Sequence, residues 1–181
     1  MEKIVRISRA LKVLFSVLVV IAPVLMILYW GFFNQLLELK STGVLYGVKV
    51  ADLPIKAPVS AWVRLLGFMA ACPSLAVDLY ALLKLRRLFA LYARGQIFEK
   101  ANVGCIKALG YALLAGQALS PVSQALLTLV LTFSNPKGQR MVEIGLSDAN
   151  LTALVCGVMI IVVAFIMDEG RKLQEEQSLT I

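Results

Sequence analysis

Four long apolar segments, separated by polar stretches, dominate the pattern of the chain. They cover residues 13–37, 65–83, 108–133 and 148–167. A helix needs about 20 apolar residues to cross a hydrocarbon core about 30 Å thick, so each segment can span a membrane. Apolar and polar residues do not alternate along them, as they would in the strands of a transmembrane barrel. The pattern predicts an all-α fold, a four-helix transmembrane bundle in which residues 1–181 form one integral membrane domain.

The first apolar segment has the basic start of a cleaved signal peptide, with Lys3, Arg6, Arg9 and Lys12 before it. However, its apolar run is about twice as long as the core of such a peptide. No small-x-small cleavage pattern follows Trp30–Phe33. We therefore expect this segment to be retained as the first helix.

Lys and Arg residues are distributed unevenly over the two sides of the predicted bundle. Twelve lie before the first span, between the second and third spans, or after the fourth, whereas six lie in the other two loops. Basic residues accumulate in the cytoplasmic loops of membrane proteins. We therefore expect both termini to be cytoplasmic.

Composition supports a membrane protein. The chain is 60% hydrophobic and 16% charged, with a mean hydropathy of +0.83. A soluble domain is usually about 45–50% apolar and about 25% charged, so the composition argues against a soluble globule and excludes a disordered chain. The net charge of +7 first reflects orientation toward the lipid bilayer, and no direct binding of nucleic acid is expected.

The two loops on the outer side carry apolar pieces. Val44–Val50 surrounds Gly47 and predicts a short hairpin or an extended cover over the helix ends. The turn-rich stretch Ser134–Gly138 is followed by Met141–Ile144, and we expect the apolar pieces of the two loops to pair. Ser147 and Asp148 are suited to cap the fourth helix.

On the cytoplasmic side, residues 84–94 keep a helical period, with Leu85 and Leu88 on one face and Arg86 and Arg87 on another. The second helix is therefore expected to continue beyond the lipid until Gly95, a residue type common just after a helix. A new helix should begin near Glu99.

The sequence offers little for catalysis. It contains no His, the usual ligand or base at haem, zinc and hydrolase sites. It also lacks glycine-rich nucleotide loops and a nucleophile elbow. Cys72, Cys105 and Cys156 form no Cys-x-x-Cys pair, so a thiol redox site is not supported. We expect a protein that is not an enzyme and holds no cofactor or metal.

Asp78 is the one ionisable residue inside the first three spans. An acid at membrane depth costs at least a few kcal/mol and often has a function. One reading gives Asp78 a proton or ligand role. The other places it at the cytoplasmic interface or in a pair with a basic neighbour such as Lys84, six residues further along the helix.

Three prolines, Pro23, Pro73 and Pro121, fall inside spans and are expected to kink the helices. Kinked helices permit an internal cavity. The polar residues that are candidates to line it are Gln117, Ser120, Ser123 and Gln124. Such residues equally serve as hydrogen-bonding links between helices.

Residues 168–181 form an acidic, amphipathic tail with Asp168, Glu169 and Leu173. It can be a solvated helix end, a segment that docks on the basic residues 84–107, or an edge presented to a partner.

The stretch LRRLFALYARGQIFEKANV (85–103) and the ending DEGRKLQEEQSLTI resemble a bacterial integral membrane family of unknown function, DUF2975. A basic, Leu-rich helix leads there to a Gly-x-x-Phe turn, matched by Gly95 and Phe98, with Asn102 after it. The family's acidic terminal motif is matched by Glu175, Glu176, Leu179, Thr180 and Ile181. The resemblance implies a multi-pass protein of the bacterial cytoplasmic (inner) membrane. Its members are often encoded beside a small helix-turn-helix regulator of the Xre type.

The leading hypothesis is a membrane partner that binds or sequesters such a regulator. Its contact residues would be Arg86, Arg87, Phe89, Tyr92, Arg94, Gly95, Phe98 and Asn102, with Glu175, Glu176, Leu179, Thr180 and Ile181 of the tail. The alternative is a small transporter or transporter subunit that uses Asp78, Gln117 and Gln124. A purely structural membrane subunit is the third possibility, and the oligomeric state stays open.

Overall fold

The computed structural model describes residues 2–97, 99–136, 138–145 and 148–179. Four long helices account for most of them: α1 (Glu2–Gly31), α3 (Ala61–Tyr92), α4 (Lys100–Thr132) and α5 (Asp148–Leu179). Each is long and apolar enough to cross a membrane. The predicted all-α architecture with four spanning helices is confirmed. Many exposed side chains on α1 and α5 are large and apolar, as expected of surfaces that face lipid.

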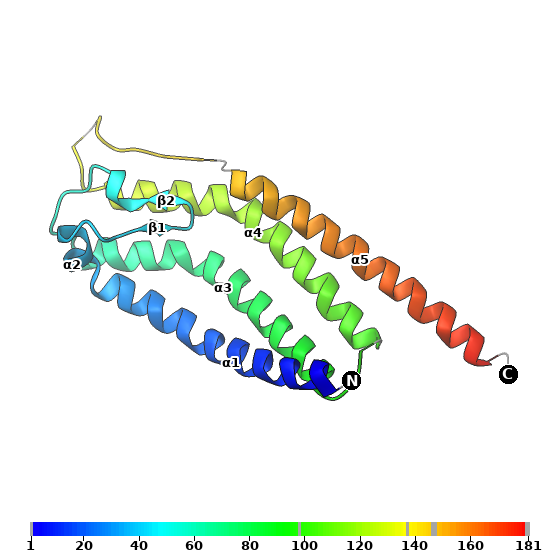
Figure 1. Cartoon of the computed structure of the whole chain (residues 1–181). Coiled ribbons are helices and arrows are strands. Elements are labelled where there is room, and N and C mark those ends of the chain that lie inside the picture. The colour runs from blue at the N-terminus through cyan, green and yellow to red at the C-terminus, as the bar shows by residue number, and fades with distance from the viewer. Residues whose placement is uncertain (1, 98, 137, 146–147, 180–181) are drawn as a thin grey trace.

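The long helices pack in chain order, each against the next. The main contacts join α1 to α3, α3 to α4, and α4 to α5. Figure 1 shows these helices side by side, with α3 and α4 in the centre and α1 and α5 at the two edges. The helix order, which the sequence left open, is therefore a row rather than a closed ring.

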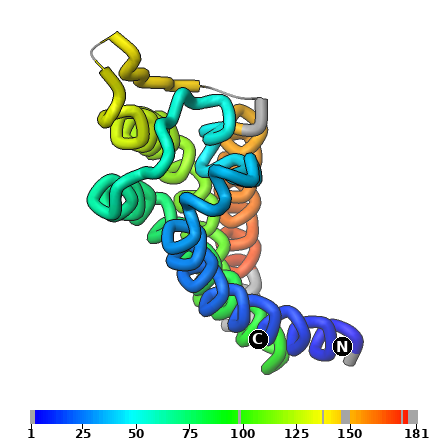
Figure 2. Tube along the Cα trace, turned by 90° about the vertical axis from the view of Figure 1, so that its left-hand side faces the viewer, coloured from blue at the N-terminus to red at the C-terminus, as the bar shows by residue number. Residues whose placement is uncertain are grey.

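The two ends of this row differ in structure. The N-terminus, the connection between α3 and α4, and the end of α5 lie at one end, which we call the terminal end (Figure 1). The opposite end, the hairpin end, holds α2 (Phe33–Glu38), β1 (Val44–Leu45), β2 (Val48–Lys49) and a short 3₁₀ turn, η1 (Val50–Asp52). Figure 2 shows these segments gathered over the ends of the helices.

A compact core sits under the hairpin end. Its central side chains, all buried, are Trp30, Phe33, Val48, Val50 and Leu127. The rings of Trp30 and Phe33 stack with centroids 5.0 Å apart, and the indole lies against Gly67 of α3, where a Cβ would come within 2.1 Å of it. Apolar loop residues thus complete the core that the helices begin.

The predicted hairpin is confirmed, with Leu45 opposite Val48 in an antiparallel pair. The two turn residues, Tyr46 and Gly47, have φ of 47° and 88°. Positive φ at both positions is the pattern of a type I′ turn, the turn that matches the twist of a two-residue hairpin.

The loop before α5 differs from expectation. In the described part of the chain the sheet contains β1 and β2 alone, so the prediction that Met141–Ile144 pairs with the first loop is wrong. This segment instead runs along α4. Three of its backbone N–H groups donate to α4 side chains: Met141 to Thr132 Oγ1 (3.1 Å), Glu143 to Thr128 Oγ1 (3.0 Å) and Gly145 to Gln124 Oε1 (2.8 Å).

The physical reason lies in two matching repeats. Gln124, Thr128 and Thr132 follow one another at every fourth position, so they share a face of α4 about one helical turn apart. Alternate residues of an extended segment recur at a comparable spacing, about 6.6 Å. We call these three side chains the α4 ladder, because their oxygens accept hydrogen bonds from the backbone N–H groups of the segment, as the carbonyls of a neighbouring strand would.

Both central helices bend near their middles in Figure 1. Pro73 lies inside α3 and Pro121 lies inside α4. Proline has no N–H to donate and its ring crowds the preceding turn, which explains a bend at these places.

At the other edge of the row, α4 and α5 approach closely at two glycines. A Cβ added to Gly110 would lie 2.9 Å from the backbone oxygen of Gly157. Small residues allow such backbone contact between helices in membranes.

Candidate functional site

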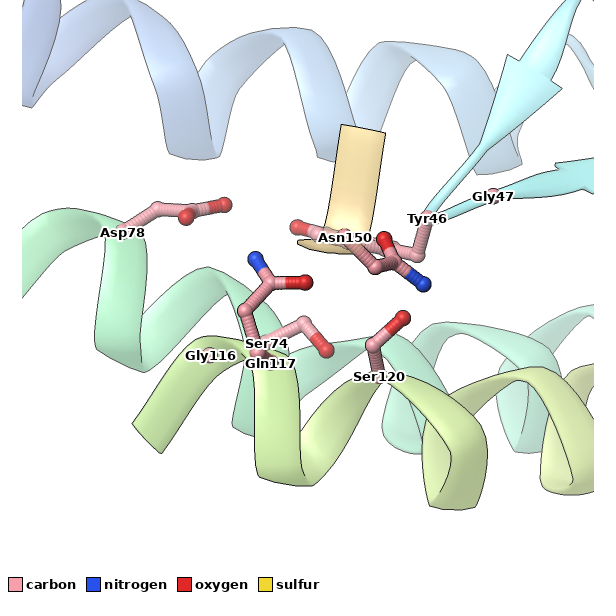
Figure 3. Close-up of a pocket in the computed structure, with 8 residues that line it drawn as sticks. All are labelled: Tyr46, Gly47, Ser74, Asp78, Gly116, Gln117, Ser120 and Asn150. Carbon is pink, nitrogen blue, oxygen red and sulfur yellow. The ribbon is translucent and has the colours of Figure 1, made fainter. Parts of the chain in front are cut away.

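A polar pocket of about 160 Å³ lies where the bent parts of α3 and α4 meet the turn of the hairpin and the start of α5 (Figure 3). It is lined by Tyr46, Gly47, Ser74, Asp78, Gly116, Gln117, Ser120 and Asn150. Ser74 and Asp78 come from α3, and Gln117 and Ser120 come from α4. Four separate elements therefore contribute to one small site.

Asp78 carries the only charge among the lining residues that the structure describes. Its carboxylate points into the pocket (Figure 3). Among the residues that the structure describes, none donates a hydrogen bond to it or forms an ion pair with it. Lys84, the basic neighbour considered from the sequence, lies over the ring of Tyr80 instead, with Nζ 4.9 Å from the centroid.

The other side-chain oxygen atoms of the pocket differ in whether they have a hydrogen-bond partner. Gln117 Oε1 is buried and has no hydrogen-bond partner among the described residues. Ser74 Oγ lies 2.8 Å from Ser123 Oγ, which links α3 to α4. Ser120 Oγ accepts a hydrogen bond of 3.0 Å from Gln124 Nε2.

The four residues of the third span that were candidates to line a cavity thus have two roles. Gln117 and Ser120 line the pocket, whereas Ser123 and Gln124 are buried and bond to other elements. Both readings offered by the sequence, a cavity and hydrogen-bonding links, apply to different residues of the same helix.

Tyr46 reaches the pocket from the hairpin. A non-glycine residue with positive φ is uncommon, and a bulky one is a marked outlier at a cost of about 1–3 kcal/mol. Asn is the usual first residue of such a turn. Burial, with a smaller contribution from the charge of Asp78, raises the pKa of the Tyr46 hydroxyl to about 12, so the hydroxyl keeps its proton at neutral pH.

At the terminal end, the arginines predicted to contact a partner are at the surface. Arg86, Arg87 and Arg94 are exposed. Phe89 and Tyr92 are partly buried and pack in edge-to-face contact, 6.0 Å between centroids. Phe89 also stacks on Phe15 of α1 at 5.5 Å, so these rings join α1 to α3.

The turn between α3 and α4 is built by two of the predicted residues. Gly95 has φ of 79°, and the N–H of Gln96 donates to the carbonyl of Leu91, as in a glycine-terminated helix. Asn102 is fully buried and its Nδ2 donates to the carbonyl of Gln96 at 2.6 Å. Phe98 lies outside the described residues.

Helix α5 continues through the tail and extends farther than the other helices at the terminal end (Figure 1). Lys107 Nζ of α4 forms a salt bridge of 3.2 Å with Asp168 Oδ2 at the base of this extension. Arg171 pairs with Asp168 and with Glu175. Glu175 and Glu176 are exposed, and Leu179 ends the helix; Thr180 and Ile181 lie outside the described residues.

Several residues of the pocket are not predicted by the sequence. The pattern places Tyr46 only in a loop, Asn150 only at a helix start and Ser74 only in a span. A bulky residue before glycine at the centre of a predicted hairpin was the one available signal for Tyr46. Thr128 and Thr132 stood at helical spacing with Gln124, but threonine is common in apolar spans.

The described residues contain no group of three or more His, Cys, Asp or Glu side chains placed to hold a metal ion. Cys72, Cys105 and Cys156 are free thiols. The pocket is thus a small polar site with one carboxylate.

Comparison with known proteins gives a family but no activity. No curated protein and no solved structure matches the chain. The sequence profile described as "Protein of unknown function (DUF2975)" matches residues 48–181, from β2 through the end of α5. The polar pocket, apart from Tyr46 and Gly47, and the whole extension of α5 fall within this match. The chain therefore belongs to the DUF2975 family.

Proposed function

We propose that this protein is a non-enzymatic membrane partner that holds a small helix-turn-helix regulator of the Xre type at its cytoplasmic face. The observation that carries the proposal is the extension of α5, which leaves the row as a helix at the same end of the molecule as the exposed Arg86, Arg87 and Arg94. A helix that protrudes with charged and apolar positions is suited to pack against another small helical protein.

The distribution of charge supports a cytoplasmic position for this end. The terminal end gathers twelve of the 18 Lys and Arg residues, on α1, around the α3–α4 turn and on α5. Such accumulation is typical of the cytoplasmic side. In a bacterium that side of the inner membrane is where a DNA-binding regulator is found.

The contacts at the base of α5 support a defined docking geometry. The Lys107–Asp168 salt bridge and the Arg171 pairs hold α5 to α4 and stiffen its last turns. Beyond them, Leu173 is 55% exposed. Arg86, Arg87 and Arg94 supply positive charge on the same end. We assign the partner surface to these arginines and to the helix after Leu173.

The first test is co-purification of the full-length protein with the regulator encoded beside it, in mild detergent. We expect deletion of residues 173–181 to lower recovery of the regulator at least tenfold, because the docking helix is lost. The double variant Lys49→Glu/Lys56→Glu, which changes exposed charges at the hairpin end, should recover as much as the parent. Equal recovery from the deletion and the parent would remove the tail from the proposal.

A transport role is the second candidate. The observation that favours it is the carboxylate of Asp78, which has no partner among the described residues and lies in a polar pocket between spanning helices. Asp78→Asn should then abolish substrate flux in proteoliposomes while capture of the regulator is unchanged. A flux that is the same in both proteins would exclude this role for Asp78.

A further inference from the structure

The pocket presents a negative charge that the residues described by the structure leave uncompensated. Asp78 has no ion-pair or hydrogen-bond partner among the described residues, and no Lys or Arg lines the pocket. A carboxylate in a spanning segment is costly unless a counter-charge or hydrogen-bond donors meet it. A ligand that brings positive charge and donors would supply both.

Several of the remaining lining groups offer oxygen acceptors, which a cation with several N–H groups needs. The buried Gln117 Oε1 has a free acceptor position. The Ser120 hydroxyl and the Tyr46 hydroxyl face the same space as Asp78 (Figure 3). An ammonium group carries three donors and no acceptor, so a carboxylate with neutral oxygens around it is complementary to such a group.

The volume of the pocket and the side chains that line it further limit the chemical class of the molecule that can bind. One carboxylate and the absence of a three-residue metal cluster among the described residues do not suit a divalent metal ion, which takes several charged or imidazole ligands. The volume of about 160 Å³ exceeds what one or two waters occupy, at about 30 Å³ each in the liquid. It is below the range of about 300–1,000 Å³ usual for drug-sized ligands. A ligand of a few heavy atoms fits.

We propose that this pocket binds a small protonated amine, with Asp78 as the counter-charge, Gln117 and Ser120 as hydrogen-bond acceptors, and Tyr46 as the cover on the hairpin side. The site lies away from the proposed partner surface, so the proposal does not depend on regulator binding. It also concerns equilibrium binding, whether or not the amine crosses the membrane.

The conformation of the hairpin supports the role of Tyr46. The turn keeps a bulky residue at positive φ where asparagine would be less strained. Gly47 allows the turn to approach α4 closely, since a Cβ there would lie 2.8 Å from Gln124 Nε2. The turn is therefore seated on α4 in a position that brings the tyrosine over the pocket, where its ring can also contact a cation.

The test is saturation-transfer NMR on the full-length protein in nanodiscs, with ethylammonium as the probe at constant ionic strength. We expect saturable binding with a Kd on the order of millimolar, since so few heavy atoms limit affinity. Asp78→Asn and Gln117→Leu should each weaken binding at least tenfold. Asp52→Asn, which removes an exposed acid from η1 away from the pocket, should bind like the parent.

The outcomes are distinct. Tyr46→Phe should keep the cover and bind within a few fold of the parent, whereas Tyr46→Ala should speed dissociation of the amine. Absence of saturable binding by the parent, or equal binding by Asp78→Asn with an unchanged melting temperature, would overturn the proposal. Equal displacement by sodium would overturn the assignment to an amine. Capture of the regulator by Asp78→Asn, measured in parallel, separates failure of this site from failure of the proposed partner role.

Discussion

Replacement of Gly110 with alanine is expected to destabilise the protein, although alanine favours helices more than glycine does. The new Cβ would lie 2.4 Å from Ile161 Cγ1 and 2.9 Å from the backbone oxygen of Gly157. The isoleucine side chain can rotate away, but the backbone of α5 cannot move without separating from α4. Overpacking of this kind costs about 1–3 kcal/mol, and the clash with backbone places Gly110→Ala toward the upper end, above the roughly 1 kcal/mol that alanine gains in helix propensity. The midpoint of thermal unfolding in detergent should fall accordingly.

The matched control lies on the same helix. A Cβ at Gly104 would meet nothing within 4 Å, so Gly104→Ala gains only helix propensity, about 1 kcal/mol. The two identical substitutions should therefore shift the unfolding midpoint in opposite directions. A Gly110→Ala protein as stable as Gly104→Ala would show that α4 and α5 are not in close backbone contact.

The second large effect is expected at the α4 ladder. Thr128→Val and Thr132→Val keep the shape of each side chain but remove the hydroxyls that accept the N–H groups of Glu143 and Met141. Residues 141 and 143 are exposed, so their freed N–H groups can bond to water. The net loss is then about 1 kcal/mol for each bond, or about 2 kcal/mol together.

Hydrogen exchange of the Met141 and Glu143 amides measures this loss directly. In the double valine variant we expect exchange roughly thirtyfold faster, since about 1.4 kcal/mol is a factor of ten. The double serine variant keeps both hydroxyls and should exchange as the parent does. Equal exchange in the valine and serine variants would mean that the ladder does not hold the segment.

The spanning helices could be predicted because membrane insertion is decided by local composition. Twenty apolar residues suffice to identify a span, whatever its neighbours are. The route of residues 141–145 could not be predicted in the same way. Gln124, Thr128 and Thr132 look in the sequence like an ordinary polar side of a helix. Their role becomes visible only once the loop segment that they hydrogen-bond is placed beside them.

The pocket shows the same limit. Asp78, Gln117 and Ser120 could be singled out, because charged and polar residues are rare in spans. Their meeting with Tyr46 depends on how deeply the hairpin sits on α4, which is set by the long-range contact between Gly47 and Gln124. A residue of the pocket could therefore be predicted from the sequence only where it is a polar residue within an apolar span. The contact between distant segments could not be predicted.

The serial order of the helices has a consequence for biogenesis. Since α3 docks on α1, α4 on α3, and α5 on α4, each new helix finds its partner already in the bilayer when it leaves the ribosome. Most contacts then join helices that are synthesised one after the other. Such a predominance of contacts between consecutive elements favours fast folding without long-lived intermediates. The hairpin is the exception. It is synthesised before α4 but seats on Gln124, so its final position has to await the third helix.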